Sequence, residues 1–117
     1  MGAGSDAWLG TTWGSDDDRA AVTADLEAAV AWAGERGVPL YVGEFGTYDT
    51  ADAASRVRWT AWVRDEFERL ELPWAYWDLA TDFGAYDAGR REWRRDLLEA
   101  LLPPTRPAPP SPRPSAP

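Results

Sequence analysis

Glu44 is the residue of this sequence that is best placed to do chemistry. It follows the apolar segment 38–42, which is partly β-branched and typical of a short strand buried on both faces. Gly43 and Gly46 flank the carboxylate and let the backbone turn. Barrels and other α/β folds place catalytic groups at the C-terminal ends of buried parallel strands. A strand-end glutamate can also cap a helix or pair with an arginine, so spacing alone leaves these alternatives open.

Aromatic side chains are a second group that could form a functional site, because the sequence has eight Trp residues among its 117. Flat apolar faces of sugars stack on aromatic rings, so Trp residues in or beside loops are candidates for a carbohydrate site, with packing as the alternative. These candidates are Trp8, Trp13 and Trp77. The Trp residues that fall on helical periods are instead expected in the core: Trp32, Trp59, Trp62 and Trp93.

Residue types that are missing exclude several other chemistries. The sequence has no cysteine and no histidine, which excludes disulfides, thiol catalysis, the usual general base and nearly all classical metal sites. We therefore expect no cofactor and no metal. The net charge of −8 argues against a nucleic-acid partner. No apolar run reaches 18 residues, so no membrane span is predicted.

The elements that must position these residues alternate between helix and strand. Helices are predicted from residue 15 to residue 34 or 37, over 51–70 and over 91–102, and strands over 38–42 and 73–77. Ser15 and the three aspartates after it predict a capped helix N-terminus rather than a metal cluster. The pattern contains no hairpin signal, so we expect the two strands to be parallel in a right-handed βαβ unit.

The predicted helix 51–70 has one apolar and one charged face. Its apolar face consists of Trp59, Trp62, Val63, Phe67 and Leu70. The charged side chains are expected to be mostly solvated: Arg56, Arg64, Asp65, Glu66 and Arg69. For Arg56, near the start of this helix, a structural ion pair is favoured over contact with a ligand.

Two parallel strands are too few to make a stable sheet. Both outer edges would be unpaired, and a parallel sheet needs cover on both faces. The pattern therefore indicates a piece of a larger α/β sheet, or an obligate assembly. Residues 103–117 do not belong to this unit, because eight of these fifteen residues are proline. They are expected to be extended, as an interdomain linker or as a disordered end.

Several segments together resemble glycoside hydrolase family 5, the cellulase family of (β/α)8 barrels. The resemblance covers roughly residues 8–102. It rests on the segments Leu-Tyr-Val-Gly-Glu-Phe-Gly (40–46), Ser-Arg-x-x-Trp (55–59), Trp-Ala-Tyr-Trp-Asp (74–78) and Phe-Gly-x-Tyr-Asp (83–87). The segment Trp-Leu-Gly-Thr-Thr-Trp (8–13) is similar to the loop after the sixth strand in that family.

The resemblance implies an incomplete α/β fold, the C-terminal portion of a TIM (β/α)8 barrel. In this interpretation the chain supplies helix 6, strand 7, helix 7, strand 8 and helix 8. Residues 1–102 would form this part of the barrel, and 103–117 a Pro-rich tail that could join a carbohydrate-binding module. A barrel has about 250 residues, so roughly 40% of one is expected here.

The resemblance also implies a retaining hydrolase that acts on β-linked polysaccharides or oligosaccharides outside the cell. Glu44 matches the family's nucleophile and Trp77 its sugar platform, while Trp8 and Trp13 are candidates for outer sugar subsites. Tyr48, Phe83 and Tyr86 are weaker candidates for sugar contacts. The family's acid/base lies in an Asn-Glu-Pro signature, and this chain has no Asn.

The chain alone is therefore expected to be inactive. Asp78 and Asp82 follow the predicted second strand, but nothing marks either as a replacement acid. Two rival interpretations stay open, a non-catalytic carbohydrate-binding piece and a truncated product without a function.

Overall fold

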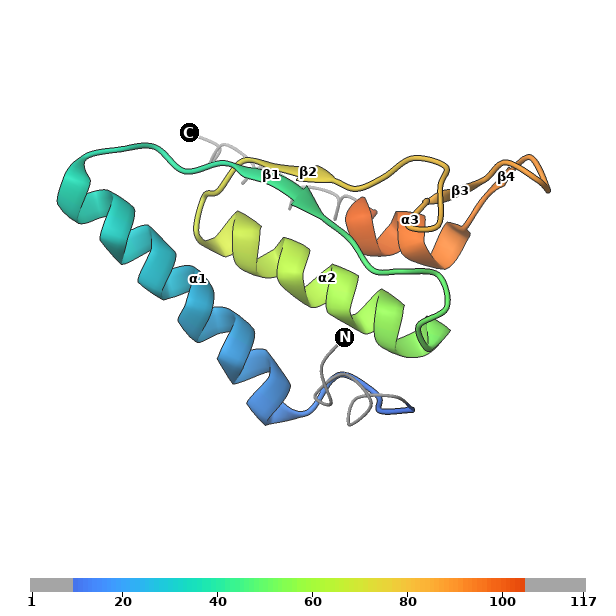
Figure 1. The fold of residues 1–117 in the computed structure, drawn as a ribbon, viewed down its shortest axis with the longest axis horizontal. Helices are drawn as coiled ribbons and strands as arrows, with labels where there is room; N and C mark the ends of the chain where they lie inside the picture. The colour runs from blue at the N-terminus through green and yellow to red at the C-terminus, as the bar shows by residue number, and fades with distance from the viewer. Residues whose placement is uncertain (1–9, 105–117) are drawn as a thin grey trace, which may run out of the picture.

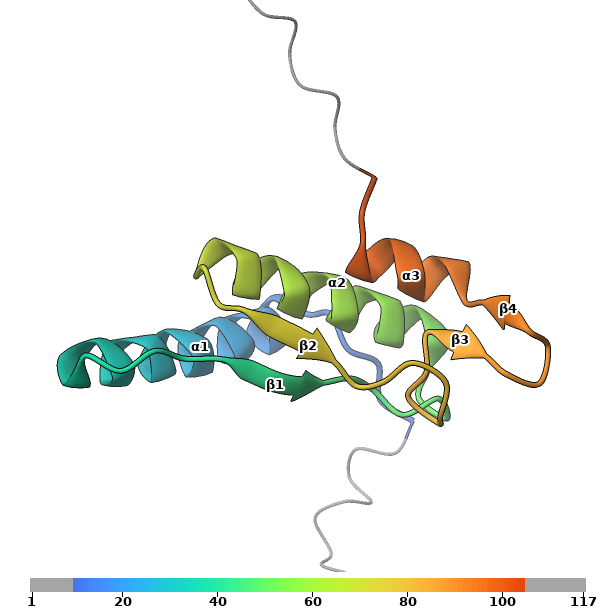
Figure 2. The same ribbon diagram turned by 90° about the horizontal axis from the view of Figure 1, so that it is seen from above.

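The computed structural model describes residues 10–104, and Trp8 and most of the Pro-rich tail lie outside them. The helices are α1 (Asp16–Arg36), α2 (Ala53–Arg69) and α3 (Arg95–Leu101), and the strands are β1 (Val42–Phe45), β2 (Trp74–Tyr76), β3 (Tyr86–Asp87) and β4 (Glu92–Trp93). Figure 1 shows α2 lying along the β1–β2 pair, with α1 beyond it. In Figure 2 the two strands run side by side and α3 lies near α2 on the side away from α1.

Both ends of α1 are capped as the sequence predicts. The Ser15 side chain accepts a hydrogen bond from the backbone N–H of Asp18, and the Asp18 carboxylate accepts one from the backbone N–H of Ser15. This reciprocal pair is a capping box, and three aspartates in the first turn favour the helix dipole. The helix ends at Gly37, whose φ of 62° is a left-handed conformation that glycine adopts without strain.

The β1 and β2 strands are parallel, which confirms the predicted βαβ unit. Val42 is paired with Trp74 and Phe45 with Tyr76, with an irregularity between the two pairs. The first strand, however, starts four residues later than predicted, and Val38 and Tyr41 are exposed rather than buried. Backbone pairing with the short strand β2 begins only where the N–H of Val42 donates to Pro73. Glu44 consequently lies inside β1 and not after it.

A hairpin that the sequence pattern did not indicate precedes the last helix. Strands β3 and β4 are antiparallel, and their turn is fastened by the Asp87 carboxylate, which accepts the backbone N–H of Arg90 at 2.9 Å. The predicted helix 91–102 therefore begins only at Arg95. Trp93 is on β4, where it is 47% exposed and packs edge-on against Tyr86, so its predicted core position is wrong.

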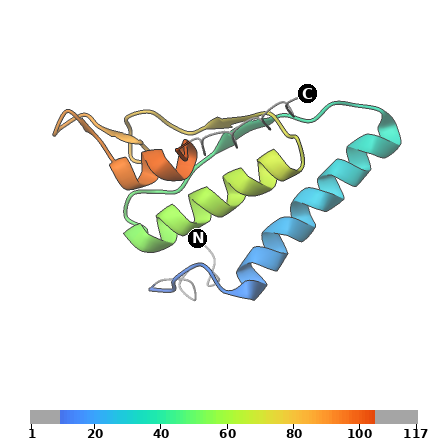
Figure 3. The ribbon, with the colours of Figure 1, turned by 180° about the vertical axis from the view of Figure 1, so that it is seen from behind.

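The core lies between the β1–β2 pair and helices α2 and α3. Its buried members are Phe45, Val63, Phe67, Ala85, Leu97 and Leu101. Trp59 packs against this cluster, as predicted, and so does Trp74. Figure 3 shows α2 on one face of the strand pair, and within the described residues no helix covers the opposite face.

Helix α1 packs mainly against α2 among the described elements. Trp32 is 51% exposed, so its predicted core position is wrong. The guanidinium of Arg36 instead covers the Trp32 ring at 4.4 Å. Trp62 is half-buried, with the Arg19 guanidinium 5.2 Å from its ring centre. The Arg19–Trp62 pair joins α1 to α2, whereas Arg36 and Trp32 both lie on α1.

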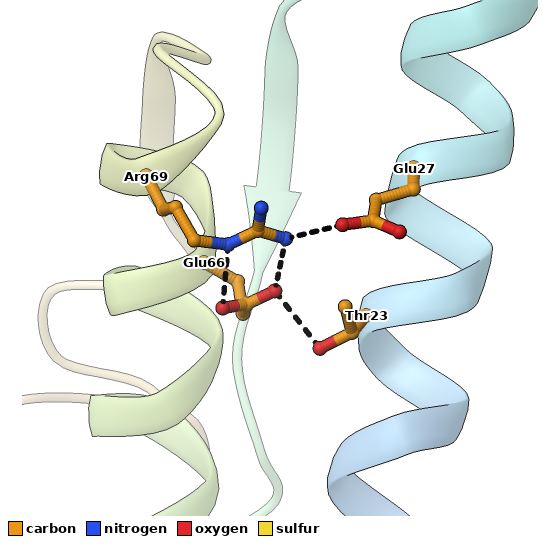
Figure 4. Close-up of polar contacts among 4 residues, drawn as sticks. All are labelled: Thr23, Glu27, Glu66 and Arg69. Atoms are coloured by element: carbon orange, nitrogen blue, oxygen red, sulfur yellow. Dashed lines mark hydrogen bonds and ion pairs between the residues drawn. The ribbon is translucent and has the colours of Figure 1, made fainter.

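Glu66 is buried between α1 and α2, contrary to the predicted solvated face. Arg69 donates two hydrogen bonds to its carboxylate, at 3.0 and 2.7 Å, and Thr23 on α1 donates a third at 2.9 Å. The same arginine also bonds Glu27 on α1 at 2.9 Å (Figure 4). The hydrogen bonds from Arg69, followed by that from Thr23, lower the pKa of Glu66 although burial opposes them. This network joins the two helices.

Candidate functional site

Glu44 and Trp77 occupy the C-terminal ends of two neighbouring parallel strands. Glu44 is exposed, whereas its neighbour Phe45 is buried. Trp77 follows directly after β2 and is 48% exposed. The Glu44 carboxylate forms no hydrogen bond or ion pair with another described residue, so neither the helix-cap nor the arginine-pair alternative is seen there. Both side chains are available to a ligand at this edge of the sheet.

Backbone contacts hold these two strand ends tightly together. The N–H of Trp77 donates to the carbonyl oxygen of Phe45 at 2.8 Å. One residue further, a Cβ atom on Gly46 would collide with the carbonyl oxygen of Trp77, so only glycine fits there. The peptide bond from Trp77 to Asp78 is cis. The sequence predicted that Gly46 lets the backbone turn beside Glu44. The structure shows that glycine is needed there because two backbone segments approach closely.

Arg56 ties together the loops that follow the two strands. It is only 6% exposed, and its Nε donates to Thr47 Oγ1 at 3.1 Å. Its Nη2 donates to the carbonyl oxygens of Phe83 and Gly84 at 2.6 and 3.4 Å. The predicted solvated arginine in an ion pair is therefore wrong in both respects, since all these partners are neutral. Its predicted structural role agrees with the contacts.

Tyr76 adds a second donor to the same buried group. Its hydroxyl donates to the carbonyl oxygen of Phe83 at 2.8 Å. Burial of the phenol raises the pKa of Tyr76, with nearby Arg56 acting in the opposite direction. The carbonyl oxygen of Phe83 thus accepts hydrogen bonds from β2 and from α2 at once.

The outer parts of the two loops also meet. The backbone N–H of Asp49 donates to the carbonyl oxygen of Asp82 at 2.7 Å, and Tyr48 donates its hydroxyl to the Asp82 carboxylate at 3.3 Å. The Tyr48 and Phe83 rings pack edge to face at 5.5 Å. The Asp82 carboxylate raises the pKa of Tyr48, because a neighbouring negative charge disfavours the phenolate.

Trp13 is half-buried beside the start of α2. Its backbone N–H donates to Ser55 Oγ at 2.9 Å, and its carbonyl oxygen accepts two hydrogen bonds from Arg58 at 3.0 Å. It lines a pocket of about 550 Å³ together with Tyr48 and Trp59. Neither Glu44 nor Trp77 lines this pocket.

The two aspartates after β2 are engaged in local contacts. The Asp78 carboxylate accepts hydrogen bonds from the backbone N–H and the hydroxyl of Thr81, at 3.2 and 2.8 Å. Asp82 accepts one from Tyr48.

The part of the chain that is described holds no group of three or more acidic side chains arranged to bind a metal ion. None of its helices is long and apolar enough to cross a bilayer.

Comparison with known proteins identifies the family. Residues 5–82 match the model of the cellulase family, glycosyl hydrolase family 5. This chain belongs to that family. Its βαβ unit is accordingly part of the α/β fold of a family 5 glycoside hydrolase, as the sequence resemblance implied.

Relatives of known sequence are endoglucanases. Endoglucanase H of Acetivibrio thermocellus is 30% identical in an alignment of 103 residues, and the match covers 83% of this chain and 11% of that protein. Endoglucanase B of Clostridium cellulovorans is 32% identical over 71 residues, which are 61% of this chain and 16% of that protein. The chain thus spans less than a fifth of either relative.

Solved structures of Thermotoga maritima Cel5A have the same local fold. The complex of Cel5A with cellobiose is 41% identical to this family 5 chain, with a TM-score of 0.80. The match covers 87% of this chain and 33% of Cel5A. The Cel5A complex with mannotriose gives the same values.

Proposed function

We propose that residues 1–102 are the C-terminal part of a (β/α)8 barrel. In this assignment α1 is helix 6, β1 strand 7, α2 helix 7, β2 strand 8 and α3 helix 8. The parallel β1–β2 pair supports it, as does the face of the pair that no described helix covers. Residues 103–117 would be a linker beyond the barrel, suited to join a carbohydrate-binding module.

The activity that we propose is retaining hydrolysis of β-linked glucans, carried out by a complete barrel that contains this segment. The observation that carries this proposal is the exposed, unpaired carboxylate of Glu44 beside exposed Trp77, at the ends of adjacent parallel strands. Barrel enzymes place their catalytic groups at this edge. The endoglucanase relatives and the cellobiose and mannotriose complexes of Cel5A support a β-linked saccharide as substrate.

Glu44 would act as the nucleophile in a double displacement. Its carboxylate attacks the anomeric carbon while a carboxylic acid protonates the departing glycosidic oxygen, so a glycosyl ester forms on Glu44. The second carboxylate, now ionised, takes a proton from water, which attacks the anomeric carbon and frees Glu44. The two carboxyl groups must lie about 5–5.5 Å apart for this chemistry.

The second carboxylate has no candidate among the described residues of this chain. Asp78 and Asp82 are held by local hydrogen bonds, and Glu44 has no acidic neighbour in contact. We therefore propose that the acid/base comes from outside this segment and that the segment alone does not hydrolyse glycosides. If it had a function alone, exposed Trp77 would favour sugar binding without turnover.

Three aromatic residues are assigned to sugar contact. Trp77 would form the platform beneath the sugar at the cleavage point, since it is exposed directly after β2, the strand that is paired with the strand of Glu44. Trp13 and Trp8 would serve outer subsites, with the pocket beside Trp13 as supporting evidence.

Polysaccharides are too large to enter cells, so the complete enzyme would act outside the cell.

A chimera tests the proposal in the context of a complete barrel. Residues 5–102 would replace the matching segment of Thermotoga maritima Cel5A, and the product is called the Cel5A chimera below. It is expected to hydrolyse a soluble β-glucan, and Glu44→Gln is expected to lower kcat at least about a thousandfold. Glu99→Gln, which changes an exposed carboxylate on α3, is the matched control. Unchanged turnover in the Glu44→Gln variant would contradict the proposal.

A further inference from the structure

We infer that Arg56 is a positioning residue for the reaction: its buried guanidinium fixes the Glu44 strand end relative to the Trp77 strand end. The inference rests on the function proposed for Glu44 and Trp77 and adds a group that does not touch the sugar. Arg56 acts through the loops that follow β1 and β2.

The contacts of Arg56 are divided between the two loops. Nε donates to Thr47 Oγ1, and Thr47 is three residues beyond Glu44. Nη2 donates to the carbonyl oxygens of Phe83 and Gly84, in the loop that follows Trp77. One rigid, planar guanidinium therefore fixes the spacing between the two loops. Its own position is fixed because Arg56 lies in the first turn of α2, where its backbone N–H donates to Asp52.

Other contacts couple this spacing to the site. On the strand side, the N–H of Trp77 donates to Phe45, and Gly46 touches the Trp77 carbonyl group. On the outer side, Asp49 donates to the Asp82 carbonyl oxygen at 2.7 Å. In the loop after β1, Arg56 contacts Thr47, which lies between Gly46 and Asp49. In the loop after β2 it contacts Phe83 and Gly84, which directly follow Asp82. Arg56 thus adds a buried tie to the exposed contacts that Tyr48 makes with Asp82 and Phe83.

The chemistry of the buried guanidinium explains why arginine is needed. A buried charge is costly unless hydrogen bonds satisfy it, and here neutral oxygens do so without a carboxylate partner. Guanidinium presents its donors in a fixed planar fork, whereas the lysine ammonium is a point charge on a flexible stem. Lysine would keep the charge but could not reproduce the divided set of bonds.

The test uses Arg56→Lys in the Cel5A chimera, with Arg64→Lys as matched control. Arg64 is on the same helix and also donates to a backbone carbonyl oxygen, that of Ala100, but at α3 rather than at the site. Functional sites are titrated with a 2-deoxy-2-fluoro cellobioside, which leaves a slowly hydrolysed ester on the nucleophile. Turnover is then expressed per titrated site, which removes any loss that is due only to unfolded protein.

The expected result is a fall in kcat per titrated site of about ten- to a hundredfold for Arg56→Lys, because a misplacement of about 1 Å can cost a hundredfold in rate. KM should change less than about threefold, since Arg56 does not contact the sugar. Arg64→Lys should leave kcat per site unchanged. A kcat per site that is unchanged in Arg56→Lys, whatever the fraction of folded protein, would overturn the inference.

Thr47→Val provides a second route if the lysine variant does not fold. It removes the acceptor of Nε without adding a buried charge, and a severalfold fall in kcat per site is expected. An unchanged value would again overturn the inference. Absence of any ester on Glu44 in the parent chimera would instead contradict the proposed function itself, so the two failures are distinguishable.

Discussion

Gly46 and Trp77 touch through their backbones: there is no room for a Cβ atom at Gly46 because the carbonyl oxygen of Trp77 occupies its place. Together with the 2.8 Å hydrogen bond from Trp77 to Phe45, this contact sets how closely the ends of β1 and β2 approach. The proposed nucleophile and the proposed sugar platform are thus positioned by main-chain contacts before any side chain contributes.

Gly46→Ala is expected to force these strand ends apart. Overpacking of this kind costs about 1–3 kcal/mol in stability, and kcat of the Cel5A chimera should fall as Glu44 moves. Gly43→Ala is the control in the same strand, because its Cβ would be 3.6 Å from the Tyr41 side chain, an ordinary contact. Thermal unfolding and turnover of both variants check the prediction, and equal behaviour of the two would contradict it.

Trp77→Ala is expected to weaken binding of the sugar more than it slows the chemical step. Aromatic contacts contribute about 0.5–1.5 kcal/mol beyond area burial, so KM for a cello-oligosaccharide should rise about two- to tenfold or more. Trp77→Phe, which keeps an aromatic face, should lose less. Kinetics of the two variants test this. A KM that is unchanged in Trp77→Ala would remove Trp77 from the substrate platform.

The protein is expected to lose stability at low pH because Glu66 becomes protonated. Hydrogen bonds from Arg69 and Thr23 lower the pKa of Glu66 in the folded state below its ordinary value of 4.5. The folded state therefore binds this proton less readily than the unfolded state, so the stabilisation is complete above the ordinary value and is lost as the pH falls through the lowered pKa. Glu66→Gln should flatten the dependence of the unfolding temperature on pH between about 5 and 3. A slope that Glu66→Gln leaves unaltered would contradict this.

Thr60→Val is expected to stabilise the protein. Thr60 is 0% exposed, and its hydroxyl has no hydrogen-bond partner among the described residues. Removal of an unsatisfied buried hydroxyl should gain about 1 kcal/mol, or about 4–8 °C in the unfolding temperature of a domain of this size. Thr23→Val makes the same chemical change where the hydroxyl does bond Glu66, and it should destabilise. A loss of stability in Thr60→Val would show that its hydroxyl is satisfied.

Local signals in the sequence predicted the helices and the parallel pair well. Ser15 and Asp18 define the start of α1, and Gly37 defines its end, because capping depends on neighbours in the chain. The predicted start of β1 was wrong because strand pairing depends on distant residues. Pairing with β2 begins only at Val42, whose N–H donates to the carbonyl oxygen of Pro73.

The sequence does carry local signals for the hairpin and for the burial of Arg56. The segment Asp-Ala-Gly-Arg (87–90) is a turn sequence, in which the aspartate accepts the N–H three residues on. Arg56 precedes Trp59 and Val63 by three and seven residues, so it lies on the apolar stripe of α2. No local pattern predicts the neutral partners of Arg56, because they lie in two separate loops. The link between Arg56 and the site could therefore not be predicted from the sequence.

The most direct test of the central claim is to identify the residue that carries the trapped ester. The Cel5A chimera would be treated with the 2-deoxy-2-fluoro cellobioside, digested with a protease and analysed by tandem mass spectrometry. The modified peptide is expected to contain residues 40–46, with the sugar on Glu44 and none in the Glu44→Gln variant. A sugar ester on any other carboxylate of a catalytically active chimera would contradict the assignment of Glu44 as the nucleophile.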